Sequence, residues 1–132
     1  MHSTNYTSTL ILVSDDCRAS FGTVPPKPGT VAAMQYELLA NAPYTLTSDD
    51  MLTRITTERQ GRPQEDEPQV AAELFSKGQA CTRASPLVKT YGWGIHHDAE
   101  ARMALISRDS PEYERLLADD SVTKRLGMRS RR

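Results

Sequence analysis

The residue types best suited to chemistry gather between Ser76 and Ser107. This stretch holds the only tryptophan, Trp93, two of the three histidines, His96 and His97, and one of the two cysteines, Cys81. If the protein has a site, we expect it here. The stretch matches no catalytic or cofactor motif, so the residues have to be weighed one by one.

The two histidines are neighbours in an extended segment, so their side chains should point to opposite faces of a sheet. Only one of them can belong to a given site. His96 shares its expected face with Gly92 and Gly94, whose missing side chains would leave room for a ligand beside the imidazole. The alternative is that the glycines admit a helix packed close by. His97, next to the turn, is expected at a solvated hairpin end.

A run of donors precedes this segment. Arg83, Lys89 and Tyr91 could hold a small polar or anionic molecule, with the ring of Trp93 as an apolar wall. Together with His96 they form the predicted binding set. No glycine loop of a nucleotide site accompanies them. The alternative is a loop whose cations contact solvent and helix ends.

An enzyme is the second hypothesis, with Cys81 as nucleophile or His96 as general acid and base, and Arg83 stabilising negative charge. It requires that these groups converge, and a cysteine is often a small buried hydrophobe. Cys81, His96, Asp98 and Cys17 are metal-ligand types without ligand spacing, so we predict no metal and no cofactor.

Composition limits the classes of partner. Sixteen Lys and Arg against seventeen Asp and Glu create no global field toward nucleic acid or acidic membranes. The cysteines are too few and too far apart for a disulfide framework. The apolar run Leu10–Val13 is shorter than a signal-peptide core, and no segment resembles a membrane span. These observations predict a cytoplasmic protein. The oligomeric state stays open, with a homodimer among the alternatives.

The first half of the chain indicates one strand and two helices. Thr9–Val13 is β-branched and apolar, which is typical of a short buried strand. After a proline-rich loop, Thr30 is the expected cap of a helix, and Thr47 with Asp50 forms a capping arrangement for the next. Residues 57–69 contain no large apolar side chain, which predicts a mobile loop. Pro68 suits the first turn of a third helix.

The second half indicates a hairpin and a last helix. Tyr91–His97 and Arg102–Ser107 flank a polar turn; a loop centred between Ala99 and Glu100 would pair Ile95 with Ala104 and Trp93 with Ile106. Because both faces carry apolar residues, we expect this hairpin in the centre of the sheet.

Ser110 followed by Pro111 indicates the start of the last helix. Short strands and helices without a βαβ rhythm predict a single α+β domain over residues 1–132, with helices covering a small, mainly antiparallel sheet.

The chain ends in a basic tail. The segment Lys124–Arg132 holds five cations and no acid, after a short turn expected at Ser121–Leu126. The cations could contact nucleic acid or an acidic protein, but no recognition helix or interleaved aromatics support this. We therefore expect residues 127–132 to form a free terminus that folding does not need.

Several strings resemble one family of small proteins. HSTNYTSTLILVSDDC, MQYELLANAPYTLTSDD, FSKGQACTRASPLVKTYGWGIHHDAEARMAL and the ending SPEYERL through MRSRR are similar to the domain of unknown function six-one-five-seven. The resemblance covers almost the whole chain and implies a stand-alone domain, often bacterial. It brings no established activity and assigns no catalytic residue. It adds weight to Tyr91–His96 and Arg83–Leu87, which family members show in similar form.

Overall fold

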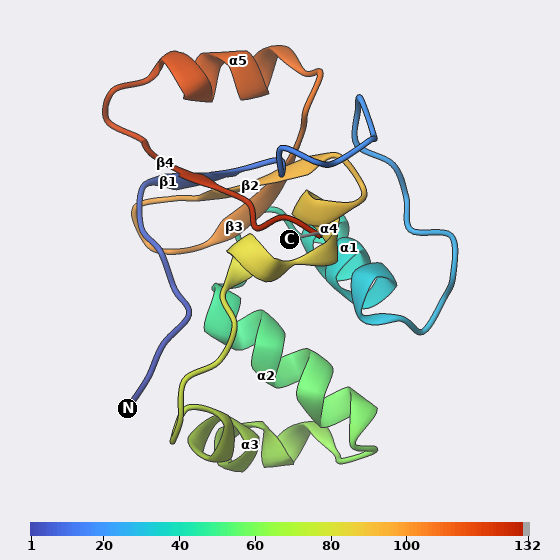
Figure 1. Cartoon of the computed structure of the whole chain (residues 1–132). Helices are drawn as coiled ribbons and strands as arrows, with labels where there is room; N and C mark the ends of the chain where they lie inside the picture. Colours follow the sequence, from blue (N-terminus) through green and yellow to red (C-terminus); the bar gives the residue numbers. More distant parts are fainter. Residues whose placement is uncertain (131–132) are drawn as a thin grey trace.

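A four-stranded sheet organises the protein in a computed structural model that describes residues 1–130. The strands are β1 (Thr9–Leu12), β2 (Trp93–His97), β3 (Met103–Ser107) and β4 (Thr123–Leu126), in the spatial order β3-β2-β1-β4. β2 is antiparallel to both β1 and β3, whereas β4 is parallel to β1. The fold is therefore α+β, as predicted, with a mixed and mostly antiparallel sheet (Figure 1).

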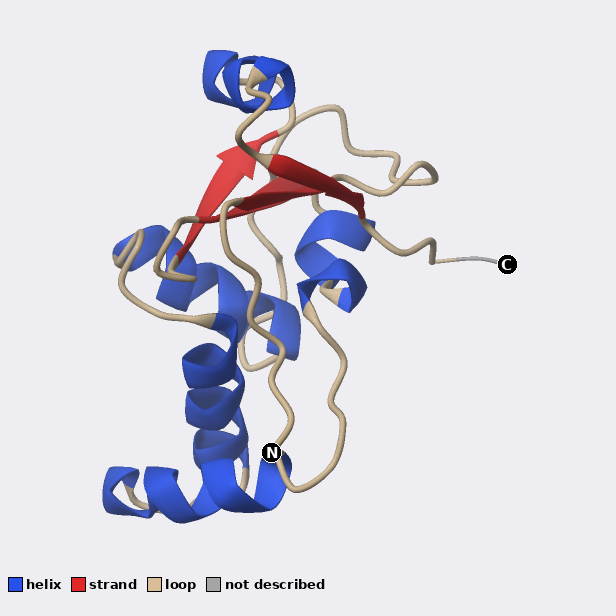
Figure 2. Ribbon diagram, turned by 90° about the vertical axis from the view of Figure 1, so that its left-hand side faces the viewer, coloured by secondary structure: helices blue, strands red, loops and turns tan. Residues whose placement is uncertain are grey.

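Helices cover both faces of this sheet. The described residues form α1 (Val31–Asn41), α2 (Ser48–Arg59), η1 (Gln64–Asp66), α3 (Glu67–Leu74), η2 (Thr82–Ala84), α4 (Pro86–Lys89) and α5 (Pro111–Ala118), where η denotes a 3-10 helix. Figure 2 shows α5 on one side of the sheet and the other helices on the opposite side. α3 packs on α2 and lies farthest from the sheet. The short helices η2 and α4 were not predicted.

The helix starts expected from capping residues are confirmed. The side-chain oxygens of Thr30, Thr47 and Ser110 each accept a hydrogen bond from a backbone N–H three residues on. At α2 the Asp50 carboxylate also accepts from the Thr47 N–H, which completes a capping box. Local side-chain chemistry therefore sets where these helices begin.

Two apolar clusters lie on the two faces of the sheet. The larger cluster, between the sheet and α1, α2 and α4, contains Ile11, Leu39, Met51, Ile55, Leu87, Val88, Ile95 and Met103. The smaller cluster, beneath α5, contains Leu10, Val13, Cys17, Ile106, Tyr113 and Val122. Alternate residues of β1 and β3 enter opposite clusters, as the pleat of a strand requires.

The predicted hairpin exists, but its predicted register is wrong by one residue. Trp93 pairs with Ser107 and Ile95 with Leu105. The turn has three residues, not an even number, because Asp98 N–H bonds to the Arg102 carbonyl and Ala101 adopts a left-handed φ of 68°. Because of this shift, Trp93 and Ile106 do not share a face of the sheet as expected. Ile106 lies on the α5 face, and Trp93 lies on the opposite face.

The predicted central position holds for one strand of the hairpin only. β2 lies inside the sheet, with β1 and β3 as neighbours, while β3 forms an edge. Ile95 is fully buried, and Trp93 is partly buried against the larger cluster. The Trp93 indole Nε1 donates to the Thr23 carbonyl at 2.8 Å.

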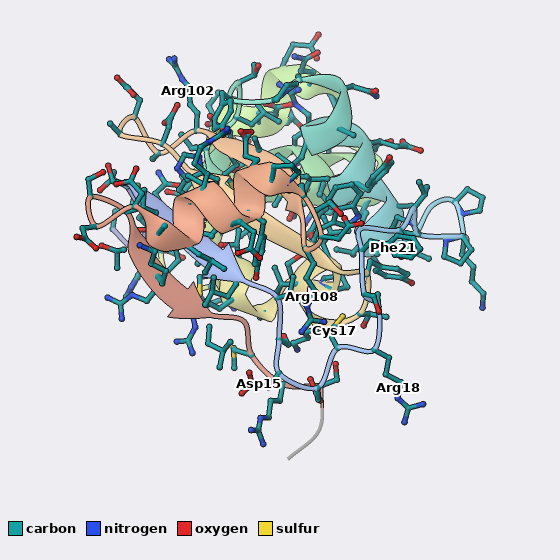
Figure 3. All side chains as sticks on the ribbon, turned by 90° about the horizontal axis from the view of Figure 1, so that it is seen from above. Asp15, Cys17, Arg18, Phe21, Arg102 and Arg108 are labelled. Atoms are coloured by element: carbon teal, nitrogen blue, oxygen red, sulfur yellow. The ribbon has the colours of Figure 1, made fainter. Side chains whose placement is uncertain are left out.

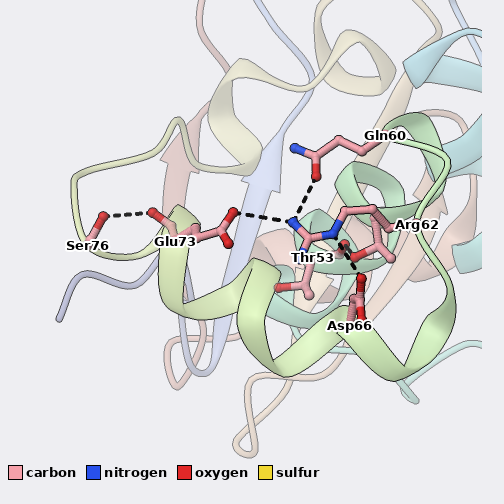
Figure 4. A network of polar contacts seen from close by, with 7 residues as sticks. Thr53, Gln60, Arg62, Asp66, Glu73 and Ser76 are labelled. Carbon is pink, nitrogen blue, oxygen red and sulfur yellow. Dashed lines mark hydrogen bonds and ion pairs between the residues drawn. The ribbon is translucent and has the colours of Figure 1, made fainter.

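The segment 57–69, predicted as a mobile loop, is mostly helical. It contains the end of α2, all of η1 and the start of α3. Arg62 holds the connection, because its guanidinium lies 3.1 Å from Asp66 Oδ2 and 3.3 Å from Glu73 Oε1 (Figure 4). Backbone hydrogen bonds hold the turn as well, because the Arg62 N–H donates to the Thr57 carbonyl and the Asp66 N–H to the Pro63 carbonyl. The sequence pattern failed because backbone and charged contacts, and not a hydrophobic stripe, order this corner.

The C-terminal prediction also needs correction. Residues 123–126 form strand β4 and not a turn. Beyond it, Gly127 N–H donates to the Leu12 carbonyl and Met128 N–H to the Arg83 carbonyl. Arg129 approaches Asp15 at 3.5 Å, and Ser130 N–H donates to Asp16. Residues 127–130 are therefore attached to the domain by backbone hydrogen bonds, a bond to the Asp16 carboxylate and an ion pair; Arg131 and Arg132 lie outside the described residues.

Candidate functional site

His97 is the buried histidine of β2, contrary to the expectation of a solvated hairpin end. Its side chain is 0% exposed, and its Nε2 is hydrogen-bonded to Thr82 Oγ1 at 2.9 Å. The ring of Tyr6 meets the imidazole edge-on, with 5.3 Å between centroids. Burial, followed by the charge of His96, lowers the pKa of His97 to about 4, so the imidazole is neutral at pH 7.

One atom of His97 has no partner. Among the described residues, its Nδ1 is the only buried side-chain nitrogen or oxygen that makes no hydrogen bond. A polar atom left in this state costs about 1–3 kcal/mol, so it is rare in native proteins. The buried imidazole therefore lowers the stability of the fold, and for this reason we treat its surroundings as a candidate site.

Cys81 is connected to His97 through Tyr6, the aromatic residue that packs against the imidazole. The Tyr6 hydroxyl donates a hydrogen bond to Cys81 Sγ at 3.1 Å, and Cys81 is partly exposed. Burial, and next the hydrogen bond to Cys81, raise the pKa of Tyr6, so the phenol keeps its proton. The charges of Arg83 and Arg125 lower this pKa, but burial and the hydrogen bond outweigh them. We call Tyr6, Cys81, Thr82 and His97 the Cys81 cluster.

Three separate parts of the chain bring the Cys81 cluster together. Cys81 and Thr82 lie at the start of η2, and His97 ends β2. Tyr6 comes from an N-terminal arm that runs down from β1 toward α3 (Figure 1). The arm is anchored at the start of α2, where Asp49 Oδ1 accepts bonds of 2.7 Å from the backbone N–H and the hydroxyl of Thr4. Because Asp49 lies in the first turn of α2, these bonds fix the position of the arm relative to that helix.

A groove of about 180 Å³ borders the Cys81 cluster. It lies between α1, the start of α2 and the η2–α4 segment. Its polar lining comes from Gln35, Ser48, Cys81, Thr82 and Ser85, and its apolar or small lining from Val31, Met51, Leu52, Ala80, Ala84 and Pro86. No charged side chain contributes to this lining. The groove therefore offers hydroxyl, amide and thiol groups against apolar walls.

The polar side chains of the groove are ordered by hydrogen bonds. Ser85 Oγ donates to Gln35 Oε1 at 2.6 Å, and Ser85 Oγ also accepts from the Leu87 N–H as the cap of α4. Ser48 Oγ and Thr4 Oγ1 are 2.7 Å apart. These contacts fix the side chains before any ligand arrives, which lowers the entropy cost of binding.

The space expected beside His96 is filled. A Cβ on Gly94 would lie 2.7 Å from the Tyr113 ring, so α5 occupies the gap that the glycine leaves. Gly92 instead has a left-handed φ of 76° and approaches the Phe21 backbone. His96 Nδ1 is hydrogen-bonded to the Tyr44 hydroxyl at 2.8 Å. The structure thus matches the alternative in which these glycines admit neighbouring chain.

The other residues of the predicted binding set are dispersed. Arg83 Nε donates to the Leu126 carbonyl at 2.7 Å, which turns its side chain toward β4. Tyr91 and Trp93 pack against the larger apolar cluster. Lys89 lines a separate hollow of about 390 Å³ with Asp16, Arg18, Thr90 and Ser130. These residues therefore do not enclose one ligand together with His96.

Cys81 and His96, which the enzyme hypothesis paired, lie in different surroundings. Cys81 contacts Tyr6 and neighbours Thr82, both tied to His97 on the face of the larger cluster. His96 points to the opposite face. Tyr6, Thr82 and His97 were missed from sequence, because nothing local indicates that the N-terminal arm folds over the end of β2.

A hollow of about 320 Å³ between α2 and α3 is lined by Arg54, Thr57, Glu58, Arg62, Gln64 and Glu67. Its arginines already pair with Asp66, Glu67 and Glu73 across α2 and α3. Within residues 1–130, no group of three acidic, histidine or cysteine side chains could hold a metal ion. No helix in this part of the chain is long and apolar enough to cross a membrane.

Comparisons with known proteins agree with the resemblance seen in the sequence. No curated protein and no solved structure matches the chain. One family model does match, and it spans residues 1–132. The chain therefore belongs to the family described as "Family of unknown function (DUF6157)".

Proposed function

We propose that the protein is a cytoplasmic binding module for a small, uncharged polar molecule, which lies in the groove beside the Cys81 cluster. The observation that carries this proposal is the lining of the groove: five ordered polar side chains, apolar walls and no charged residue. A few fixed polar groups in an apolar cleft are typical of small-molecule sites. Two free thiols, Cys17 and Cys81, suit a reducing compartment.

The volume and the lining restrict the ligand. About 180 Å³ is below the roughly 300 to 1,000 Å³ of sites for drug-sized ligands, so the ligand is a small metabolite. An anion would lose its hydration in a lining without a cation, at a cost that the hydroxyl groups do not offset. The proposal therefore narrows the predicted polar or anionic ligand to an uncharged one.

A ligand screen tests this proposal. We expect small amides, polyols or neutral sugars to raise the melting temperature, since a ligand at about 100 times its Kd stabilises by roughly 2.7 kcal/mol. The groove can be filled by Ala84→Leu, whereas Ala40→Leu adds the same side chain at an exposed position of α1 outside it. Binding should disappear in Ala84→Leu and persist in Ala40→Leu.

A substitution of His96 distinguishes this groove from the predicted binding set. Because His96 lies on the α5 face, His96→Ala should leave ligand binding unchanged. Amide NMR shifts caused by a ligand should fall on α1, the start of α2 and η2–α4. A ligand that shifts α5 and the surroundings of His96 would contradict the proposed location, and a screen without any hit would contradict the binding function.

A further inference from the structure

Three segments of the chain meet at Ser14, a fully buried residue just after β1. Its backbone N–H donates to the Val88 carbonyl of α4, and its hydroxyl donates to the Met128 carbonyl. A Cβ on Gly127 would lie 2.6 Å from the Leu12 carbonyl oxygen and 2.9 Å from Ser14 Oγ, so only a glycine lets the C-terminal segment come this close. The loop after β1, α4 and residues 127–130 are therefore held in fixed positions relative to one another.

The loop after β1 carries Arg18 at the surface. The Arg108 guanidinium donates to the carbonyls of Cys17 and Ala19, at 3.2 and 3.0 Å, and so fixes the backbone on both sides of Arg18. Figure 3 shows Arg108 beside Cys17, and the Arg18 side chain extends away from the domain. Arg18 is therefore an exposed cation on a loop whose backbone is ordered.

The hollow of about 390 Å³ lies where these three segments meet. Its lining comes from the loop after β1, from the end of α4 and from the C-terminal segment, and consists of Asp16, Arg18, Lys89, Thr90 and Ser130. Within residues 1–130, neither Arg18 nor Lys89 forms an ion pair. The two oxygens of the Asp16 carboxylate accept from the Ser130 N–H at 3.3 and 3.0 Å. The hollow therefore offers an anion two cations and two hydroxyl groups.

The hollow of about 320 Å³ between α2 and α3 provides the contrast. Its guanidinium groups, those of Arg54 and Arg62, are paired with Glu67, Asp66 and Glu73. An anion that entered there would have to compete with these carboxylates. Arg18 and Lys89 have no such competitor among the described ion pairs, and an anion between two cations relieves their mutual repulsion.

We propose that the hollow lined by Arg18 and Lys89 binds a small phosphate monoester by its phosphate group. A guanidinium donates two parallel N–H bonds to phosphate oxygens, and an ammonium adds a compact positive charge. The hydroxyl groups of Thr90 and Ser130 are donors for the remaining oxygens. A dianion interacts with two cations more strongly than a singly charged carboxylate does, which favours phosphate.

The volume indicates that the phosphate carries an organic group. About 390 Å³ falls within the roughly 300 to 1,000 Å³ that is usual for small-molecule sites, and is more than inorganic phosphate fills. The lining shares no residue with the groove beside the Cys81 cluster. The inference is therefore independent of the proposed function, and each can fail without the other.

An NMR titration with glycerol 3-phosphate, inorganic phosphate and glycerol tests the proposal. The ionic strength is kept constant, because salt screens exposed charges. We expect saturable amide shifts at Asp16, Arg18 and Thr90 with glycerol 3-phosphate, weaker binding of inorganic phosphate and no binding of glycerol. Shifts that fall elsewhere, or no shifts, overturn the proposal. Inorganic phosphate that binds as tightly as glycerol 3-phosphate overturns the monoester as the ligand.

Four charge-removing variants locate the site. Arg18→Gln and Lys89→Gln should each weaken the binding of glycerol 3-phosphate by about tenfold, as expected for the loss of a charge-assisted hydrogen bond. Arg59→Gln, at the end of α2, and Lys77→Gln, after α3, remove exposed cations outside the hollow and should leave the affinity unchanged. Equal losses in all four variants would show unspecific attraction and overturn the site.

Asp16→Asn should change the affinity in the opposite direction. Asparagine keeps an oxygen that accepts from the Ser130 N–H, but it removes the negative charge from the lining. Glycerol 3-phosphate should therefore bind about threefold more tightly. Damage to the fold does not produce a gain in affinity, so this result separates an electrostatic contact from a structural effect. Unchanged or weaker binding by folded Asp16→Asn contradicts a phosphate bound in this hollow.

Discussion

His96 and His97 are neighbours on β2, yet they lie in different environments. His97 is fully buried between the sheet and the N-terminal arm, with one bond to Thr82 and one unpartnered nitrogen. His96 is partly buried on the α5 face and bonds to the exposed Tyr44. The difference teaches that adjacency in a strand says little about shared function, because each face of the sheet meets different partners.

The two faces also differ in how their glycine and aromatic residues are used. On the His97 face, Trp93 lies over Gly22 and packs near Tyr36. On the His96 face, the Tyr113 ring covers Gly94 and its hydroxyl accepts the Val13 N–H at 3.0 Å. The His97 face therefore borders a polar groove, whereas the His96 face has no open space beside Gly94.

Trp93→Ala should have the largest effect. Truncation of a buried aromatic residue costs about 3–5 kcal/mol, and the partly buried Trp93 should fall near the lower end of this range. Urea denaturation measures the loss. Phe21→Ala, at a residue that is 54% exposed, is the matched control and should change the free energy of unfolding by less than about 0.5 kcal/mol. Equal losses in the two variants would contradict a core role for Trp93.

Acid should destabilise the protein through His97. Its pKa of about 4 in the folded state is below the ordinary 6.5, so the unfolded chain binds the proton more tightly. This contribution to stability is present above pH 6.5 and is lost as the pH falls from 6.5 toward 4, by roughly 3 kcal/mol in total. Urea unfolding of wild type and His97→Gln across this range isolates the histidine. Parallel pH profiles of the two proteins would show that His97 does not titrate this way.

Tyr113→Phe should have an intermediate effect. The ring still fills the space over Gly94, but the Val13 N–H loses its acceptor in a buried position. An unsatisfied buried donor costs about 1–3 kcal/mol. Thermal or urea unfolding measures this cost, and hydrogen exchange at Val13 should accelerate. If neither stability nor exchange changes, the hydroxyl is not the partner of this N–H.

His96→Ala should have the smallest effect. The imidazole is partly exposed and its partner, Tyr44, is 38% exposed, so the hydrogen bond competes with water. We expect a loss below about 1 kcal/mol in the free energy of unfolding. Burial lowers the pKa of His96 as well, so any acid destabilisation that it adds should be much smaller than that from His97. A loss larger than that of Tyr113→Phe would reverse the ranking of the two faces.

Prediction from sequence succeeded where the determinants are local. The caps at Thr30, Thr47 and Ser110 are read from side chains within three residues of the backbone groups they bind. The hairpin was found, but its register depended on one residue, Ala101, in a left-handed conformation that its side chain does not favour. The fold class followed from the kinds of element, and so needed neither the register nor the long-range pairing.

The candidate site could not be predicted in the same way. Tyr6 and Cys81 are far apart in sequence, and they come into hydrogen-bond distance because the N-terminal arm is anchored at both ends, by His2 on Phe75 and Ser8 on Asp98, as well as on Asp49. Strand β4 was missed because Thr123–Leu126 is polar, and its order comes from pairing with the buried β1. Neither feature has a local signature.

The sequence by itself determined the α+β class, the helix starts, the hairpin and membership of the family, because each depends on short-range patterns or on similarity along the chain. Only the tertiary structure decided that His97 is fully buried against Tyr6, that Tyr113 fills the gap at Gly94, and that the tail continues from a parallel strand. The physical reason is common to all three. Each depends on which distant segment packs against a face of the sheet, and a one-residue change of register exchanges the two faces.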